Sequence, residues 1–235
     1  MKKSNKILLG SFLTAVLLLT AVHIGLYAKY KNGGYTVYNE EDDLQPMAMQ
    51  SFPHIKFVSV RNVPEASVRF GDVAQVPKGE EDDMEYVRSG DTLLITGSDS
   101  ANQQGFRNYV VFNLPHNATL SLFNSNIFFE AGKKGAASNP VIYLNKSQVR
   151  FSEGGSPVLF NQLRLVASEN SSAAFLGNTE INNLEVQLSN SSIEDLKGNI
   201  GGLSIVTDTL SRIALQTKHL LKATITPDSS GVKKL

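Results

Sequence analysis

The stretch "LSLFNSNIFF", residues Leu120–Phe129, contains two short runs of alternating apolar and polar residues, joined by Asn-Ser. Similar stretches return further along the chain. They are "IYLNKSQVRF" from Ile142, "LRLVASENSSAAF" from Leu163, "LEVQLSNSSI" from Leu184 and "LSIVTDTLSRIAL" from Leu203. Alternation over such short lengths is typical of half-buried β-strands. The chain therefore repeats one unit of strand, turn and strand.

The spacing of these copies is nearly constant. They begin at positions 120, 142, 163, 184 and 203, which are 22, 21, 21 and 19 residues apart. Turn glycines at positions 132, 154, 177 and 198 keep a similar period. A period near twenty indicates a solenoid, in which each unit buries its apolar face only by stacking on its neighbours. We therefore predict an all-β fold, a parallel β-solenoid (β-helix) with coils of about 20 residues.

Stacking predicts columns of inward side chains. The first columns would contain Leu120 and Leu122, Ile142 and Leu144, Leu163 and Leu165, Leu184 and Val186, and Leu203 and Ile205. Another column would contain Ile127, Val149, Phe175, Ile193 and Ile213. Asparagine tolerates a left-handed backbone, so the predicted corners are Asn124, Asn145, Asn170 and Asn190. An antiparallel sandwich also has evenly spaced strands, but it does not require resemblance at every second strand.

A separate apolar segment precedes these repeats. Ile7–Tyr27, "ILLGSFLTAVLLLTAVHIGLY", contains 21 residues without a charge. About 20 apolar residues in a helix cross the hydrocarbon core of a bilayer, so residues 7–27 are predicted to span a membrane. A cleaved signal peptide would have a shorter apolar region and a small-residue cleavage site. Three lysines precede the segment and two follow it, which favours an amino terminus in the cytoplasm.

These features divide the chain into four predicted segments. They are the cytoplasmic tip and transmembrane helix (1–28), a polar tether (29–50), the β-solenoid domain (51–226) and a polar tail (227–235). Within the solenoid domain, residues 51–98 form an N-terminal strand region with short apolar runs such as "IKFVSV" and "DTLLITG". Residues 106–226 form the stacked coils.

The composition excludes several kinds of chemistry. The chain has no cysteine, which removes disulfides, thiolate nucleophiles and cysteine-based zinc sites. Residues 32–235 contain 17 basic and 22 acidic side chains, a net charge of 17 − 22 = −5. Nucleic-acid binding domains carry basic patches that neutralise phosphates. No nucleic acid is therefore expected as a partner.

The acidic and histidine side chains are the candidates for catalysis and metal binding. A polysaccharide-cleaving solenoid needs carboxylates that converge on one face. The candidates are Glu130, Glu153, Glu169, Glu180, Glu185 and Asp195, which do not share a position in the repeat. The histidines, His23, His54, His116 and His219, lack the spacing of metal ligands. The acidic runs Glu40–Asp43 and Glu80–Asp83 lack the spacing of a calcium loop. We therefore predict that the protein is not an enzyme. We also predict that it has no catalytic residues, no cofactor and no metal site.

The strand region carries a family resemblance. "FVSVRNVPEASVRFGDVAQV" from Phe57, followed by "EYVRSGDTLLITG" ending at Gly97, resembles the start of the auto-transporter adhesin, head-GIN domain family of Bacteroidetes-type bacteria. That family has two alternating strands, a G-D-x-L-x-I element and stacked β-coils rich in Ser, Asn and Gly. The resemblance covers most of residues 52–226. It implies a β-solenoid in the cell envelope and supplies no catalytic residues.

Together these observations predict a non-catalytic, membrane-anchored β-solenoid with a binding or adhesion-like surface. Its predicted location is the bacterial inner membrane, which residues 7–27 cross once, with the solenoid domain in the periplasm. An envelope glycan or an envelope protein would be the partner, because parallel coils present a long flat face. Two alternatives stay open: a polymerising scaffold that resembles bactofilins, and a polysaccharide-active β-helix enzyme.

Overall fold

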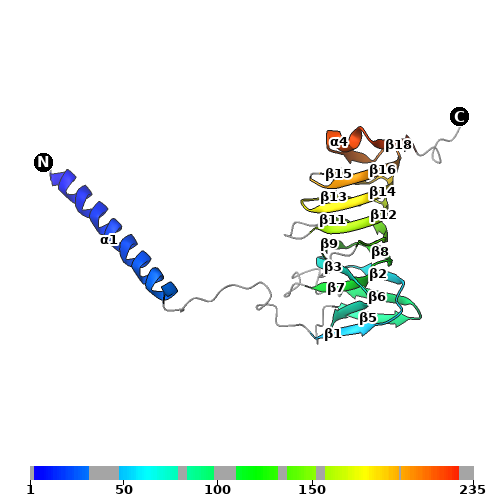
Figure 1. Cartoon of the computed structure of the whole chain (residues 1–235), viewed down its shortest axis with the longest axis horizontal. Coiled ribbons are helices and arrows are strands. Elements are labelled where there is room, and N and C mark those ends of the chain that lie inside the picture. Colours follow the sequence, from blue (N-terminus) through cyan, green and yellow to red (C-terminus); the bar gives the residue numbers. More distant parts are fainter. Residues whose placement is uncertain are drawn as a thin grey trace. The chain divides into compact units, whose positions relative to one another are not determined.

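The computed structural model describes residues 3–31, 48–78, 84–97, 110–131, 137–151, 157–195 and 197–227. The chain divides into two compact units, Met1–Pro46 and Met47–Leu235. The first unit contains the helix α1 (Lys3–Lys31). The second contains two β-sheets and a short helix, α4 (Thr217–Leu220) (Figure 1).

The helix α1 corrects the prediction of a membrane anchor. Residues 7–27 are helical, as expected. Within the described residues, however, no helix combines the length and the apolar character that crossing a membrane requires. A span needs about 20 predominantly apolar residues, and polar side chains such as Thr14, Thr20 and His23 interrupt this run. The predicted single-pass location in a bacterial inner membrane, with a periplasmic solenoid, is therefore wrong.

The described strands form two sheets of nine strands each. In stacking order, sheet A contains β1 (Met49–Phe52), β4 (Ala74–Pro77), β7 (Val111–Pro115), β3 (Ala66–Gly71), β9 (Asn126–Glu130), β11 (Gln148–Phe151), β13 (Ser172–Phe175), β15 (Ser192–Asp195) and β17 (Arg212–Ala214). Sheet B contains β5 (Met84–Ser89), β6 (Thr92–Gly97), β2 (Phe57–Arg61), β8 (Thr119–Phe123), β10 (Val141–Asn145), β12 (Val158–Ser168), β14 (Thr179–Ser189), β16 (Asn199–Thr207) and β18 (Ala223–Pro227). Each repeated sequence unit contributes one strand to each sheet.

Parallel pairing between successive units confirms the predicted β-solenoid (Figure 1). Leu120 of β8 lies beside Ile142 of β10, and Leu184 of β14 lies beside Leu203 of β16, as the repeat predicts. These side chains are buried. The same alternation that defines the strands in the sequence therefore places one face of each strand in a shared core.

One predicted column is displaced between the second and third units. Ile142 lies beside Leu165, two residues beyond the predicted Leu163. The third unit differs from the others at its corner, where two consecutive residues, Glu169 and Asn170, have positive φ values of 53° and 63°. The period of the sequence indicates the repeat, but an irregular unit makes the exact register ambiguous.

The second displaced position involves aromatic packing. Phe175 was predicted beside Val149, but Ala173 takes that place. Phe175 instead continues a column that begins with Phe129 and Phe151. The rings are stacked, with centroids 4.8 Å apart between Phe129 and Phe151 and 4.7 Å apart between Phe151 and Phe175. The core of sheet A is therefore built around a stack of phenylalanine rings.

The strands of residues 51–98 join the same two sheets. β2 pairs in parallel with β6 on one side and β8 on the other, and β3 pairs in the same way with β7 and β9. The unit formed by β2 and β3 therefore lies between two units that follow it in the sequence. At this end of the solenoid, β1 pairs antiparallel with β4, and β5 pairs antiparallel with β6.

Candidate binding surface

A ladder of serines, all buried except the half-buried Ser211, runs along the corner where the chain passes from sheet B to sheet A. Each serine hydroxyl oxygen accepts a hydrogen bond from a backbone N–H one unit earlier, at N···Oγ distances of 3.1 Å and, in one case, 3.3 Å. The ladder contains Ser125, Ser147, Ser171, Ser191 and Ser211. Buried backbone N–H groups require such partners. The serines thus tie successive corners together.

The residue before most of these serines has a left-handed backbone. Asn124, Asn170 and Asn190 have φ values of 48°, 63° and 48°, which confirms the predicted asparagine corners. The predicted corner at Asn145 is displaced by one residue, because Lys146 has the positive φ of 50°. Asparagine and glycine adopt this conformation with least strain, so the lysine corner could not be located from residue type.

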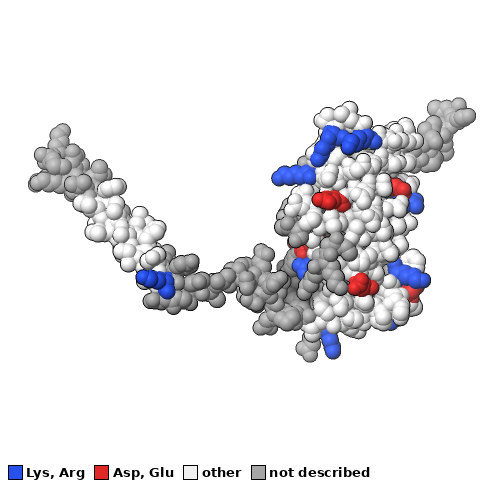
Figure 2. Space-filling model, viewed as in Figure 1, with Lys and Arg blue, Asp and Glu red and all other residues white. Residues whose placement is uncertain are grey.

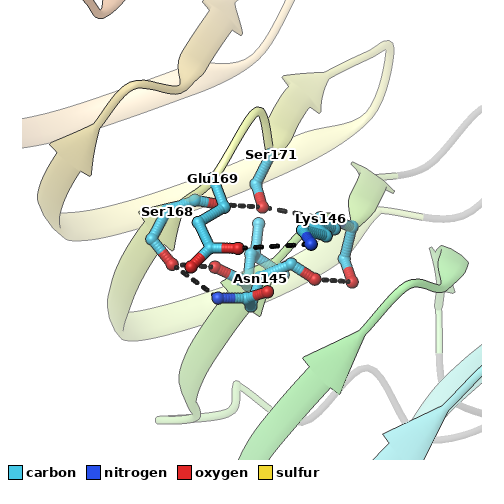
Figure 3. A network of polar contacts seen from close by, with 7 residues as sticks. Asn145, Lys146, Ser168, Glu169 and Ser171 are labelled. Atoms are coloured by element: carbon cyan, nitrogen blue, oxygen red, sulfur yellow. Dashed lines mark hydrogen bonds and ion pairs between the residues drawn. The ribbon is translucent and has the colours of Figure 1, made fainter.

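Figure 3 shows the two neighbouring corners that follow β10 and β12. The Ser168 hydroxyl donates to the carbonyl oxygen of Leu144 at 3.1 Å, and the Asn145 amide donates to Ser168 Oγ at 3.4 Å. Lys146 Nζ and Glu169 Oε2 lie 3.6 Å apart, and both side chains are exposed. Exposed ion pairs contribute little to stability. This polar network therefore supports the backbone of the two corners.

At the last corner, the Asp208 carboxylate binds the final serine of the ladder, Ser211, and the backbone of the preceding corner. Its Oδ1 accepts hydrogen bonds from the Ser211 hydroxyl at 2.6 Å and the Leu210 N–H at 3.1 Å, and its Oδ2 accepts the Asn190 N–H at 2.9 Å. The hydrogen bond from Ser211, followed by those from the backbone, lowers the pKa of Asp208. The carboxylate is therefore negatively charged at neutral pH.

The candidate catalytic carboxylates lie in separate places. Glu185 of β14 is on the outer face of sheet B, Glu169 is at a corner, and Asp195 is buried at the end of β15. Glu180 is exposed on β14, and Glu153 lies outside the described residues. In the described part of the chain, no group of three or more acidic or histidine side chains could hold a metal ion.

Glu130 is held by two partners on the outer face of sheet A. The Arg69 guanidinium donates from Nε and Nη2 to Glu130 Oε2 at 3.0 and 2.8 Å. The Ser67 hydroxyl donates to Oε1 at 2.7 Å. Both members of the ion pair are partly buried. Charge-assisted bonds of this kind are among the stronger hydrogen bonds in proteins, and these join β3 to β9.

The histidines are also dispersed. His23 bonds a carbonyl oxygen of its own helix, and His54 occupies a turn with a positive φ of 65°. His116 Nδ1 lies 2.8 Å from the hydroxyl of Ser138. His219, in α4, is buried.

His219 forms a buried pair with Asp195 that the sequence did not predict. Its Nδ1 contacts Asp195 Oδ2, and both side chains are almost fully buried, at 2% and 0% exposure. The Ile200 N–H donates to His219 Nε2 at 3.3 Å, so the ring proton lies on Nδ1. Asp195 Oδ1 also accepts the Gly198 N–H at 2.9 Å and the Gln216 amide at 3.3 Å. This network attaches α4 to the last coils and excludes solvent, so it serves the structure.

The outer face of sheet B presents three aromatic side chains, which we call the aromatic face. Phe57, Phe123 and Tyr143 are 46%, 43% and 43% exposed. They belong to β2, β8 and β10, which are neighbours in the sheet. Alternation directs them outward, because residues such as Val58 and Leu122 point into the core. The same alternation in the sequence could have identified them.

Smaller side chains surround the aromatic face. The outward residues in register with it include Leu94, Val141 and Val166, and also Ser59, Ser121 and Arg61. Further along the same sheet, the outward residues of β12, β14 and β16 are more polar. This polar half contains Arg164, Glu185, Gln187, Ser189 and Ser204. The aromatic groups are therefore confined to one part of a flat sheet.

Comparison with known proteins adds two distant structures. No family model matches the chain, and no curated protein matches it. A "putative adhesin" from Bacteroides fragilis has a TM-score of 0.31 and 11% identity, over 78% of this chain and 96% of that one. A "putative cell adhesion protein" from Clostridium sporogenes has a TM-score of 0.25 and 8% identity, over 77% and 93%. Both likenesses are too distant to carry an argument about function.

Proposed function

We propose that the protein is a non-catalytic binding module whose aromatic face holds an extended glycan chain. The observation that carries the proposal is the exposure of Phe57, Phe123 and Tyr143 on three neighbouring strands. Single exposed apolar residues are common on protein surfaces. A group of three aromatic rings on one flat sheet is less common, and clustered apolar patches mark interaction sites.

The chemistry of the face suits a glycan. Sugar rings have apolar C–H faces that stack on aromatic rings, and hydroxyl groups at their rims. Ser59, Ser121 and Arg61 lie among the rings and offer hydroxyl and guanidinium groups to those rims. By the register, Phe123 lies two positions along the strand from Tyr143, and Phe57 lies beside Thr119, four positions from Phe123. With about 4.8 Å between strands and about 3.3 Å per residue, the three rings are about 8–14 Å apart, which requires a glycan of several sugar units to reach all of them.

An envelope protein is the other partner that the sequence suggests. Stable protein interfaces have a continuous apolar core with a polar rim. On the aromatic face, by contrast, serines and an arginine separate the aromatic rings, which favours the glycan. Membership of the head-GIN domain family and the exclusion of nucleic acid both stay predictions.

The proposal of a binding role without catalysis is supported by the dispersed carboxylates. Glycoside hydrolysis needs two carboxyl groups on either side of one bond. Glu130 is engaged by Arg69 and Ser67, and Asp195 is buried against His219. Neither carboxylate is free to protonate a bound sugar. The polysaccharide-active enzyme is therefore the weaker hypothesis.

A glycan array with the full chain tests the proposal. The wild type is expected to bind a subset of extended polysaccharides. The variant Phe57→Ser/Phe123→Ser/Tyr143→Ser should give a binding signal at least tenfold weaker. The matched variant Gln187→Ala/Ser189→Ala/Ser204→Ala, in the polar half, should keep it. Binding that survives loss of the aromatic face, or absence of any bound glycan, would contradict the proposal.

A further inference from the structure

The last strand of sheet B, β18, has one open edge. Among the described residues, β18 pairs with β16 and with no other strand (Figure 1). An edge strand presents unpaired N–H and C=O groups, which the backbone of another strand can complete. Many proteins bind extended peptides in this way, as one more strand of a sheet. The edge of β18 therefore offers main-chain hydrogen bonds to an extended peptide.

The same end of the solenoid exposes apolar side chains. Ile225 lies beside Ile205 in the inward column of the core, yet it is 42% exposed because it is in the last strand. Leu220, at the end of α4, and Leu221, which follows it, are 51% and 82% exposed. A strand added beside β18 would continue the inward column, so an apolar side chain is favoured next to Ile225.

This end of the solenoid is also basic. The described residues 197–227 contain four basic side chains and one acidic side chain, a net charge of 4 − 1 = +3. Figure 2 shows basic side chains gathered at the α4 end of the solenoid. The four are exposed, and none forms an ion pair with another described residue: Lys197, Arg212, Lys218 and Lys222. A positive end of this kind favours an acidic partner.

The acidic side chains near this end are engaged or directed elsewhere. Asp208 is bonded to the Ser211 hydroxyl and to backbone N–H groups of the corner. Asp195 is buried against His219. Glu194 of β15 lies on the outer face of sheet A. The positive charge around β18 is therefore available to a partner.

The strand at the other end of sheet B, β5, lacks this selectivity. It carries two exposed side chains of opposite charge, Glu85 and Arg88. β18 has no charged residue of its own, and Lys222 directly precedes it. The surrounding charge therefore distinguishes β18 from β5 and favours β18 for an acidic strand.

We infer that β18 is the docking edge for an extended acidic segment of a partner protein, in which apolar and acidic residues alternate. Alternate side chains of a strand point to opposite faces. The apolar ones would continue the inward column beyond Ile225, and the carboxylates would be attracted by the positive charge of this end. A lipid surface could not satisfy the backbone groups of the edge. This inference is independent of the glycan proposal.

A peptide titration of the full chain tests the inference. The probe is a fluorescent peptide of about ten residues in which Glu and Val alternate, with blocked termini, and fluorescence polarisation is expected to show saturable binding. A peptide in which Pro replaces Val has the same charge but lacks half of the N–H groups that a strand needs. A peptide in which Lys replaces Glu keeps the strand pattern and reverses the charge. Both control peptides should bind at least tenfold more weakly.

Charge reversal in the protein tests the electrostatic part. Lys218→Glu/Lys222→Glu should weaken binding of the Glu-Val peptide at least fivefold, and added salt should weaken binding to the wild type. The matched variant Lys56→Glu/Arg164→Glu reverses two exposed basic residues elsewhere, with the same change in net charge, and should keep the affinity. Equal weakening by both variants would overturn the inference, because net charge alone would then account for the binding.

Hydrogen exchange locates the bound peptide. The backbone amides of β18 should exchange more slowly when the Glu-Val peptide is bound, and those of β5 should not change. Absence of binding, equal binding of the Glu-Pro peptide, or unchanged exchange in β18 would overturn the inference. So would protection of β18 only by phosphatidylglycerol vesicles, which would assign this end to a lipid surface. Protection that rises with protein concentration without any peptide would assign the edge to a second copy and would equally overturn it.

Discussion

The interior and the outer face of the solenoid follow different rules, although they are built from the same strands. One inward column of sheet B contains Leu120, Ile142, Leu165, Val186 and Ile205, all apolar and buried. The adjacent outward column contains Ser121, Tyr143, Val166, Gln187 and Val206. Stacking forces inward residues to match their neighbours above and below. Outward residues do not have to match the residues above and below them, so their identity can suit a specific binding partner.

The largest contrast is expected at the phenylalanine stack. Phe151→Ala should lower the free energy of unfolding by about 3–5 kcal/mol, because it leaves a cavity between two stacked rings. Tyr143→Ala, on the outer face, should cost about 1 kcal/mol or less. Urea unfolding followed by circular dichroism measures both. Equal losses from the two variants would remove the distinction between interior and outer face.

The buried polar pair gives the next largest effect. His219→Ala should cost about 3 kcal/mol, because it removes a buried side chain and leaves the buried Asp195 carboxyl group with one hydrogen-bond partner fewer. Replacing both residues, with Asp195→Leu and His219→Leu, should recover at least half of that loss, since an apolar side chain would extend the phenylalanine column. The same unfolding assay applies. A double variant no more stable than the single one would show that the loss does not come from an Asp195 left without its partner.

The serine ladder is expected to contribute less for each residue. Ser147→Ala removes the acceptor of the buried Ser125 N–H, at a cost of about 1–2 kcal/mol. Ser121→Ala, an exposed serine on the neighbouring strand, should change the free energy of unfolding by about 0.5 kcal/mol or less. A comparison of their urea midpoints checks this. Identical midpoints would mean that the ladder adds nothing to stability.

The smallest effect on stability is expected at the aromatic face. Phe57→Ser, measured alone, should shift the free energy of unfolding by less than about 1 kcal/mol, because the ring is already half in water. Thermal unfolding monitored by circular dichroism checks the prediction. A loss as large as that of Phe151→Ala would show that the ring belongs to the core and is not available to a ligand.

The sequence predicts the repeat well because each coil of a solenoid needs apolar residues at the same inward positions. The stacking therefore appears in the sequence as a period. Leu120 and Ile142 occupy adjacent places as expected. The register near Leu163 was wrong because spacing does not reveal the extra left-handed residue at the Glu169 corner. The span predicted at residues 7–27 failed because charge-free length alone does not establish sufficient apolar character.

The candidate site was harder to predict from the sequence than the repeat. The pair of Asp195 and His219 depends on a contact between residues 24 positions apart, made by a helix that is not part of the repeat. The aromatic face depends on register between units, which places Phe123 and Tyr143 on adjacent strands. Alternation showed which way each ring points. Only pairing showed that the rings share one surface.

The most direct test of the binding role is a calorimetric titration of the full chain with a soluble oligosaccharide of the glycan class that the array selects. The account predicts saturable binding, at least a tenfold weaker affinity for Phe57→Ser/Phe123→Ser/Tyr143→Ser, and an unchanged affinity for Gln187→Ala/Ser189→Ala/Ser204→Ala. Both variants should keep their unfolding midpoints close to that of the wild type. Equal affinities for all three proteins would contradict the account, because the aromatic face would then have no part in binding.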